Sequence, residues 1–214
     1  DLFSASLSQT SLALLVDLQT GQFAADISGA AALSINGFSS ISADSARFQF
    51  NNMGIDFSTE PRLIGVNGVV GSLEMASGTT ESPLVVINVD GLNATLDSLL
   101  TVSGDFAFEL QAGEVLAGIN RFSANFSDSI SVSNGSGALL ITSEGIAGSL
   151  SVIPSLSIPG VTLSAEQVDL EFNTITSSVS RTLEVGGETV ILDLPSALST
   201  SPYLSLIVTG AVLD

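Results

Sequence analysis

The sequence predicts an all-β protein built from antiparallel strands. Three observations support this fold class: apolar and polar residues alternate with a period of two, dipeptides that favour tight turns recur at short intervals, and no segment keeps the 3.6-residue period of an amphipathic helix. Side chains that alternate along a strand point to opposite faces of a sheet. Each strand is therefore expected to present one apolar face and one polar face.

The strands are clearest where the alternation is strict, over residues 46–51, 100–103 and 105–109. Five dipeptides mark turns, because Gly, Asn and Asp tolerate the positive φ angles of tight hairpins. These dipeptides are Asn36-Gly37, Asn67-Gly68, Asp90-Gly91, Asn134-Gly135 and Gly186-Gly187. The best helix candidates, residues 91–100 and 195–200, are short, and we expect no more than a turn in either.

The second half of the chain repeats the first. Seven segments match in the same order, and the offset between matched residues drifts only from 119 (Phe3 with Phe122) to 125 (Ala13 with Ala138). Matches that keep their order indicate an internal duplication. The matched segments are 3–8 with 122–127, 13–16 with 138–141, 33–35 with 156–158, 41–44 with 163–166, 50–51 with 172–173, 62–75 with 181–194 and 82–91 with 201–210.

We therefore predict two related β-repeats, residues 1–119 and residues 120–214, the second of which lacks the strands equivalent to residues 96–119. A repeat without two of its strands exposes an apolar edge that invites pairing with another chain. The chain could be part of a longer array, a neighbouring molecule could donate the strands, or all strands could merge into one sheet. The pattern leaves open whether the repeats form a pair of β-sandwiches or an elongated sheet or solenoid.

The composition excludes several kinds of function. The 214 residues include 22 acidic and four basic side chains, all four of them Arg, for a net charge of −18, and there is no Lys, His, Cys or Trp. Disulfide frameworks, thiolate or imidazole chemistry and P-loop lysines all need absent residues. Nucleic acids and anionic membranes are bound through clusters of Lys and Arg, so neither is an expected partner, and no apolar run is long enough for membrane insertion.

Carboxylates are the only abundant chemical groups that could form a site. Calcium binds hard oxygen ligands, so it is the one cofactor that this composition could hold, with Asp90, Asp97 and Asp105 as candidate ligands, although no ordered calcium-binding motif is present. Asp105 and Glu109 are the only candidate pair for carboxylate-based hydrolysis. Because they share one strand face opposite Phe106 and Phe108, we interpret them as solvated carboxylates.

The phenylalanines are interpreted as core residues. Phe48 and Phe50 share one strand face, as do Phe106 and Phe108, and bulky aromatic residues are typical of the inward face of a β-layer. Without Trp and with a single Tyr, the chain offers little for sugar stacking.

Three segments carry a resemblance to a known type of protein: residues 103–109 (Ser-Gly-Asp-Phe-Ala-Phe-Glu), residues 132–140, and Val185-Gly186-Gly187 followed by residues 192–195. In these segments the chain resembles the tandem β-repeats of very large bacterial surface or secreted proteins. The resemblance implies an all-β repeat displayed outside the cell, and it supplies no catalytic residues.

The sequence thus favours a non-catalytic structural or adhesive repeat module of an extracellular or cell-surface bacterial protein, acting as a spacer or as a self-assembling fibre or surface-layer subunit completed by strand pairing between molecules. Its expected partners are further copies or neighbouring repeats. The alternative is a binding module for a polysaccharide or a calcium-bridged partner. A carboxylate hydrolase is disfavoured, and no enzyme activity is expected.

Overall fold

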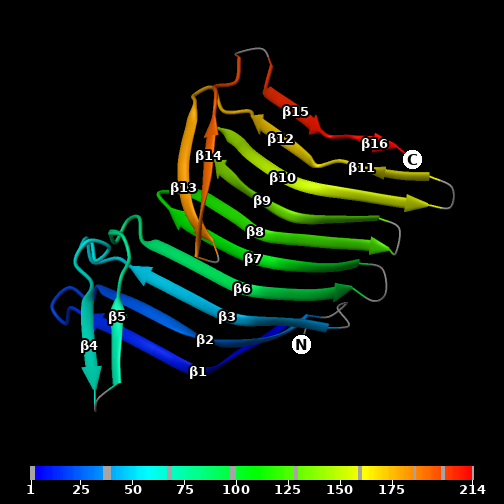
Figure 1. Ribbon diagram of the computed structural model, residues 1–214. Coiled ribbons are helices and arrows are strands. Elements are labelled where there is room, and N and C mark those ends of the chain that lie inside the picture. The colour runs from blue at the N-terminus through cyan, green and yellow to red at the C-terminus, as the bar shows by residue number, and fades with distance from the viewer. Residues whose placement is uncertain are drawn as a thin grey trace.

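The computed structural model describes residues 3–35, 40–66, 69–96, 100–127, 130–158, 161–185, 187–198 and 201–213, and it confirms the all-β, antiparallel prediction. Twelve of the sixteen strands in this part of the chain form one open sheet, and the other four form two hairpins (Figure 1). Of the arrangements left open by the sequence, the structure therefore has a single elongated sheet. The strands are β1 (Phe3–Val16), β2 (Phe23–Ile35), β3 (Ser40–Asn51), β4 (Arg62–Val66), β5 (Val69–Leu73), β6 (Leu84–Leu96), β7 (Leu100–Gln111), β8 (Glu114–Ser127), β9 (Ile130–Thr142), β10 (Gly145–Ile158), β11 (Val161–Ser164), β12 (Gln167–Asn173), β13 (Val179–Val185), β14 (Glu188–Leu194), β15 (Tyr203–Thr209) and β16 (Val212–Leu213).

The large sheet is a meander in which each strand pairs with the next one available along the chain. Its order is β1-β2-β3-β6-β7-β8-β9-β10, after which β12 and then β15 continue one half of β10, while β11 and β16 continue the other half. The hairpins β4–β5 and β13–β14 are the two interruptions: each leaves the sheet, crosses one of its faces and returns (Figure 1). We call the face that they cross the front face.

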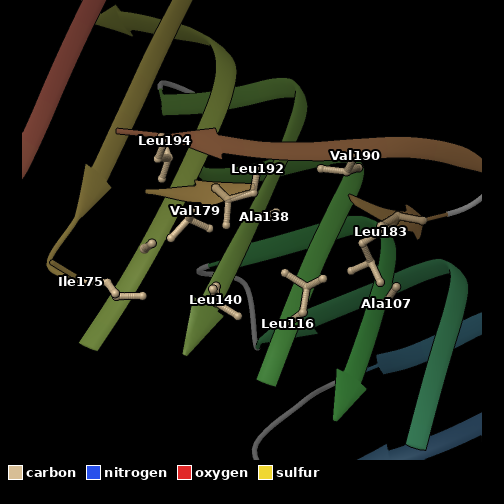
Figure 2. Packing of buried hydrophobic residues seen from close by; sticks show 12 residues of the cluster. Ala107, Leu116, Ala138, Leu140, Ile175, Val179, Leu183, Val190, Leu192 and Leu194 are labelled. Carbon is tan, nitrogen blue, oxygen red and sulfur yellow. The ribbon is translucent and has the colours of Figure 1, made fainter. Parts of the chain in front are cut away.

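Under the hairpins the front face is a packed core. Leu183, Val185, Val190, Leu192 and Leu194 of β13–β14 lie on small and aliphatic residues of the sheet (Figure 2). Small residues let the second layer approach closely: a Cβ added to Gly118 of β8 would lie 2.6 Å from a methyl group of Val185. A second, smaller core lies under β4–β5, and its members are Ala13, Ala24, Phe57, Leu73, Met75 and Leu84.

The opposite face, which we call the back face, carries three parallel rows of apolar side chains. Apart from neighbouring strands of the sheet, the main packing contacts between strands are made by the two hairpins, so they fall on the front face. The cross-strand register, from β1 or β2 towards β15, defines the rows. The first is Leu12, Ile27, Phe48, Ile87, Phe108, Ala117, Leu139, Gly148, Phe172 and Leu204; the second is Gly29, Ala46, Val89, Phe106, Ile119, Gly137, Leu150, Leu170 and Leu206; the third is Leu14, Ala25, Phe50, Val85, Leu110, Val115, Ile141 and Ile146.

The placement of the phenylalanines therefore differs from the core that the sequence predicts. Phe48 and Phe108 are 36% and 42% exposed, since the described residues form no second layer over the back face. Phe50 stacks on Phe23 with ring centroids 4.6 Å apart, within the same face. The alternation correctly predicted which residues share a face, but it could not show that this face has no covering layer.

A line of β-bulges crosses the sheet near the middle of its strands. The register breaks between β1 and β2 and in the successive pairs from β6 to β9, and at these places single residues take positive φ angles. A bulge adds one unpaired residue and increases the local twist. Asp90-Gly91 and Asn134-Gly135 belong to these bulges, inside β6 and β9, so the prediction that they form hairpin turns is wrong. Gly187 does lie in a turn, while Asn36-Gly37, Asn67-Gly68 and Gly186 fall outside the described residues.

The internal duplication is visible in equivalent hydrogen bonds. Asn51 at the end of β3 and Asn173 at the end of β12 are both fully buried. Each donates from Nδ2 to the carbonyl four residues later and to a carbonyl just after the following hairpin, and each accepts a bond from the amide two residues later. Gly91 and Gly210 likewise share a φ of 61°. In space, β1 to β6 correspond to β9 to β15, and the matched residues 122–127 lie on β8, outside that correspondence.

We expect Asn51→Ala to lower the free energy of unfolding by about 3 kcal/mol, because it leaves two buried carbonyls and one amide of the chain without partners. Asn173→Ala should have the same effect for the same reason. Denaturant titration followed by circular dichroism measures both. Asn93→Ala, at an exposed position of β6, is the matched control, and equal losses in all three variants would contradict the assigned role.

Candidate functional site

The two ends of the large sheet are the most unusual polar surfaces of the protein. In the described part of the chain, β1 pairs only with β2 and β15 only with β12, so each has a row of backbone amides and carbonyls free at its outer edge. Natural proteins protect such edges with Lys, Pro or other interrupting residues. Neither β1 nor β15 contains a charged residue or a proline. Both edges are therefore competent to pair with a further strand.

The directions of the two end strands are compatible with each other. Every neighbouring pair along the path from β1 to β15 is antiparallel, and the path has ten strands, so β1 and β15 run in opposite directions. A β15 edge placed beside a β1 edge of another unit therefore continues the antiparallel pattern. Units joined in this way would all have the same order and direction of strands along the extended sheet.

The first hairpin extends beyond the sheet that it covers. In the second half of the chain, β13 packs on β7 and β8, the two strands that precede β9. The equivalent β4 and β5 pack on β1 and β2, and the hairpin reaches past β1 at the edge of the sheet (Figure 1). Leu183 of β13 is 5% exposed, whereas its repeat equivalent Ile64 on β4 is only partly buried. The underside of β4 thus extends past β1 and is only partly covered by the described residues.

The three candidate calcium ligands lie in different settings. Asp90 accepts a hydrogen bond from Ser45 Oγ at 2.9 Å, and Asp97 lies outside the described residues. Asp105 is 1% exposed, and its carboxylate accepts bonds from Arg121 Nε at 2.5 Å and from the Gly91 amide at 2.8 Å. Within the described ranges, no group of three or more acidic side chains is arranged to hold a metal ion.

The carboxylate of Asp105 connects three strands at the line of bulges. Asp105 lies on β7, Gly91 lies on β6 and Arg121 lies on β8. Gly91 and Arg121 both donate a hydrogen bond to the Asp105 carboxylate, and both have positive φ angles. Burial raises the pKa of Asp105, but the hydrogen bonds from Arg121 and Gly91 and the charge of Arg121 outweigh it, so this pKa lies below its usual value. The sequence carries no signal for this role of Arg121, because its place beside Asp105 depends on the register of β7 and β8.

Asp105 and Glu109 do not form a hydrolytic pair. They are four residues apart on one strand, which places them about 13 Å apart, beyond the about 9.5 Å of an inverting glycosidase. Glu109 lies in a cleft between the two hairpins, near Glu74 and Glu184. Burial raises the pKa of Glu109, and the charge of Arg181 opposes this increase. Neither carboxylate faces the other across a substrate-sized space.

A groove of about 550 Å³ runs between β14 and the front face of β8, β9, β10 and β12. Its lining is mixed in charge and rich in hydroxyls, with Arg121, Glu171, Glu188, Ser136 and Ser149 among its residues. It offers hydrogen bonds to a polyhydroxylated ligand, but its lining contains no aromatic side chain on which a sugar could stack.

Comparisons with protein-family models, with curated proteins and with solved structures found no match to this chain. Among the residues described, there is no helix with the length and apolar character needed to cross a membrane.

We expect Arg121→Ala to destabilise the fold at neutral pH, because Asp105 would stay buried without its cationic partner. The pKa of Asp105 is lowered by folding, so its contribution to stability is present above the unfolded-state pKa of about 3.9 and is lost as pH falls through the lower folded-state value. The difference in unfolding free energy between wild type and Arg121→Ala should therefore shrink as pH falls from about 6 towards 3.

Urea titrations at a series of pH values measure this difference. Arg62→Ala, which removes the same charge from an exposed position on β4, is the control. If the two variants lose the same stability at every pH, the ion pair does not hold the bulges together.

Proposed function

We propose that this protein is a non-catalytic structural repeat module, whose sheet is continued by strand pairing with a neighbouring repeat. The observation that carries the proposal is the first hairpin: it reaches past β1, and the β1 edge below it is unpaired in the described residues. The neighbouring strands would extend the ladder at β1 and bury the underside of β4. An equivalent extension at β15 makes the module a segment of a fibre or layer.

The proposal places the module outside a bacterial cell, at the surface or in a secreted assembly. Its support is the repeat, the resemblance of residues 103–109 to tandem β-repeats of surface proteins, and the net charge of −18. A high net charge keeps long assemblies soluble where salt screens repulsion beyond about 8 Å. No chemistry by Asp105 or Glu109 is needed for this role.

Ile207→Lys tests the edge pairing. Ile207 lies on the front face of β15 opposite Asp169 of β12, so a lysine there gains a nearby carboxylate and is not expected to weaken the fold. A lysine on an edge strand opposes pairing with a further strand. Light scattering after size exclusion should show a ladder of oligomers for the wild-type chain that shifts to smaller species in Ile207→Lys.

The matched control is Ile191→Lys, which makes the same change at an isoleucine that is 63% exposed on β14. It should leave the size distribution unchanged. A wild-type chain without the ladder, or an Ile207→Lys variant with the same ladder as wild type, would exclude strand pairing at β15.

A further inference from the structure

The back face of the large sheet is a second surface that the described residues leave uncovered, and it is distinct from the two edges. None of the residues in its three rows is charged or polar. Ten large aliphatic or aromatic side chains in these rows are at least 36% exposed, from Leu12 at one end to Leu206 at the other. Exposed apolar patches on monomeric proteins rarely exceed about 600 Å², and larger ones mark interaction sites.

The size of this surface fits a protein–protein interface. The ten strands from β1 to β15 span about 45 Å at the usual strand spacing, and three alternate residues extend about 17 Å along each strand. The resulting area of about 750 Å² approaches the roughly 800 Å² that each partner buries in a stable complex of standard size.

The distribution of charge favours a partner that meets this face with an apolar surface of its own. Asp26, Arg47, Glu109 and Glu171 all lie on the front face, as the register shows. Two copies placed back to back would therefore keep these groups on the outer surfaces of both sheets. A charge of −18 per copy disfavours association in general, and this arrangement places the charges of the sheet away from the contact.

When two copies meet back to back, the choice of two-fold axis decides which back-face residues face each other, and one axis sets several large residues against small ones. A two-fold axis parallel to the strands, between β7 and β8, would place β3 of one copy opposite β10 of the other and β6 opposite β9. Of the nine opposed pairs in the first two rows, five then place a larger residue on a smaller one, and the other four oppose two large residues. The five unequal pairs are Phe48 with Gly148, Phe108 with Ala117, Ala46 with Leu150, Val89 with Gly137 and Gly29 with Leu170.

Gly137 also marks a hollow on the back face. An apolar hollow of about 360 Å³ lies around it, between Ile119, Leu139, Leu150 and Phe172. A two-fold axis along the first row would set each residue against its own copy, Phe48 against Phe48 and Gly148 against Gly148, and would leave the hollow unfilled. The axis parallel to the strands instead directs the β3–β6 ridge of one copy into the hollow of the other.

We propose that two copies of this chain pack back to back through their apolar sheet faces, related by a two-fold axis parallel to the strands, as a two-layered sandwich. Sheets that pack in this way lie about 10 Å apart with interdigitating side chains. The contact is isologous, so it closes at a dimer and leaves the β1 and β15 edges of both copies free. The dimer is independent of strand pairing, and edge pairing of such dimers would give a two-layered fibre.

The test uses the full chain with Ile207→Lys, which opposes pairing at the β15 edge, and measures mass by sedimentation and light scattering up to about 100 µM. A dimer is expected. Adding Ile87→Asp on the back face should raise the dissociation constant at least about 100-fold, because a carboxylate would be buried without a partner. Ile191→Asp, the same change on the outer side of β14, should leave the dimer intact. Circular dichroism establishes that each variant is folded.

A double-mutant cycle tests the axis. Ala46 on β3 and Leu150 on β10 are five strands apart in one chain, about 24 Å, so their effects can couple only across the interface. Ala46→Leu should crowd the partner's leucine and Leu150→Ala should leave a gap, each weakening the dimer about 10-fold. The double variant exchanges the large and small residues and should recover wild-type affinity to within about threefold.

Three results would overturn the proposal: a monomer at all concentrations, a dimer that Ile87→Asp does not weaken, or single effects that simply add in the cycle. A monomer that floats with neutral phosphatidylcholine vesicles would assign the face to lipid instead. Failure of the proposed function would give a different result. The wild-type chain would then show no ladder of oligomers, while the mass of the Ile207→Lys species would still report on the dimer.

Discussion

The buried asparagines at the roots of the hairpins are the interaction on which the architecture depends. When a strand leaves a sheet to cross its face, the backbone groups at the exit and the return lose their ladder partners and become buried. Asn51 and Asn173 supply those partners from one side chain each, two donors for carbonyls and one acceptor for an amide. Without them, each hairpin would lie on the front face at the cost of two carbonyls and one amide buried without partners.

The sequence allows the local structure to be predicted well, because strand formation and facing depend on neighbours along the chain. The sequence is less informative where the same residue types suit two different local backbone structures. Asp90-Gly91 and Asn134-Gly135 satisfy the positive φ of a turn and of a bulge equally, and only the pairing of the strands on both sides decides between them. The ion pair of Asp105 with Arg121 was beyond sequence reasoning for a related reason, since residues 16 apart meet only once the register of β7 and β8 is fixed.

The two faces of the sheet have different chemistry, and that difference organises the molecule. The front face mixes carboxylates, arginines and amides with the small residues that receive the hairpins, and polar groups such as Asp26, Arg47 and Gln49 are paired locally. The back face contains none of these groups. The phenylalanine pattern has the composition of a core, as the sequence indicates, but the described residues include no second layer over it.

The second hairpin covers β7 and β8 as well as β9 and β10, and so it spans the junction between the two repeats. Neither repeat can therefore lose its strands without uncovering apolar surface that belongs to the other. In a linear array, this overlap couples each unit to its neighbour, so that stability is a property of the junctions as much as of the units. Unfolding would then spread from one unit to the next, and its cooperativity would increase with the number of overlapping junctions.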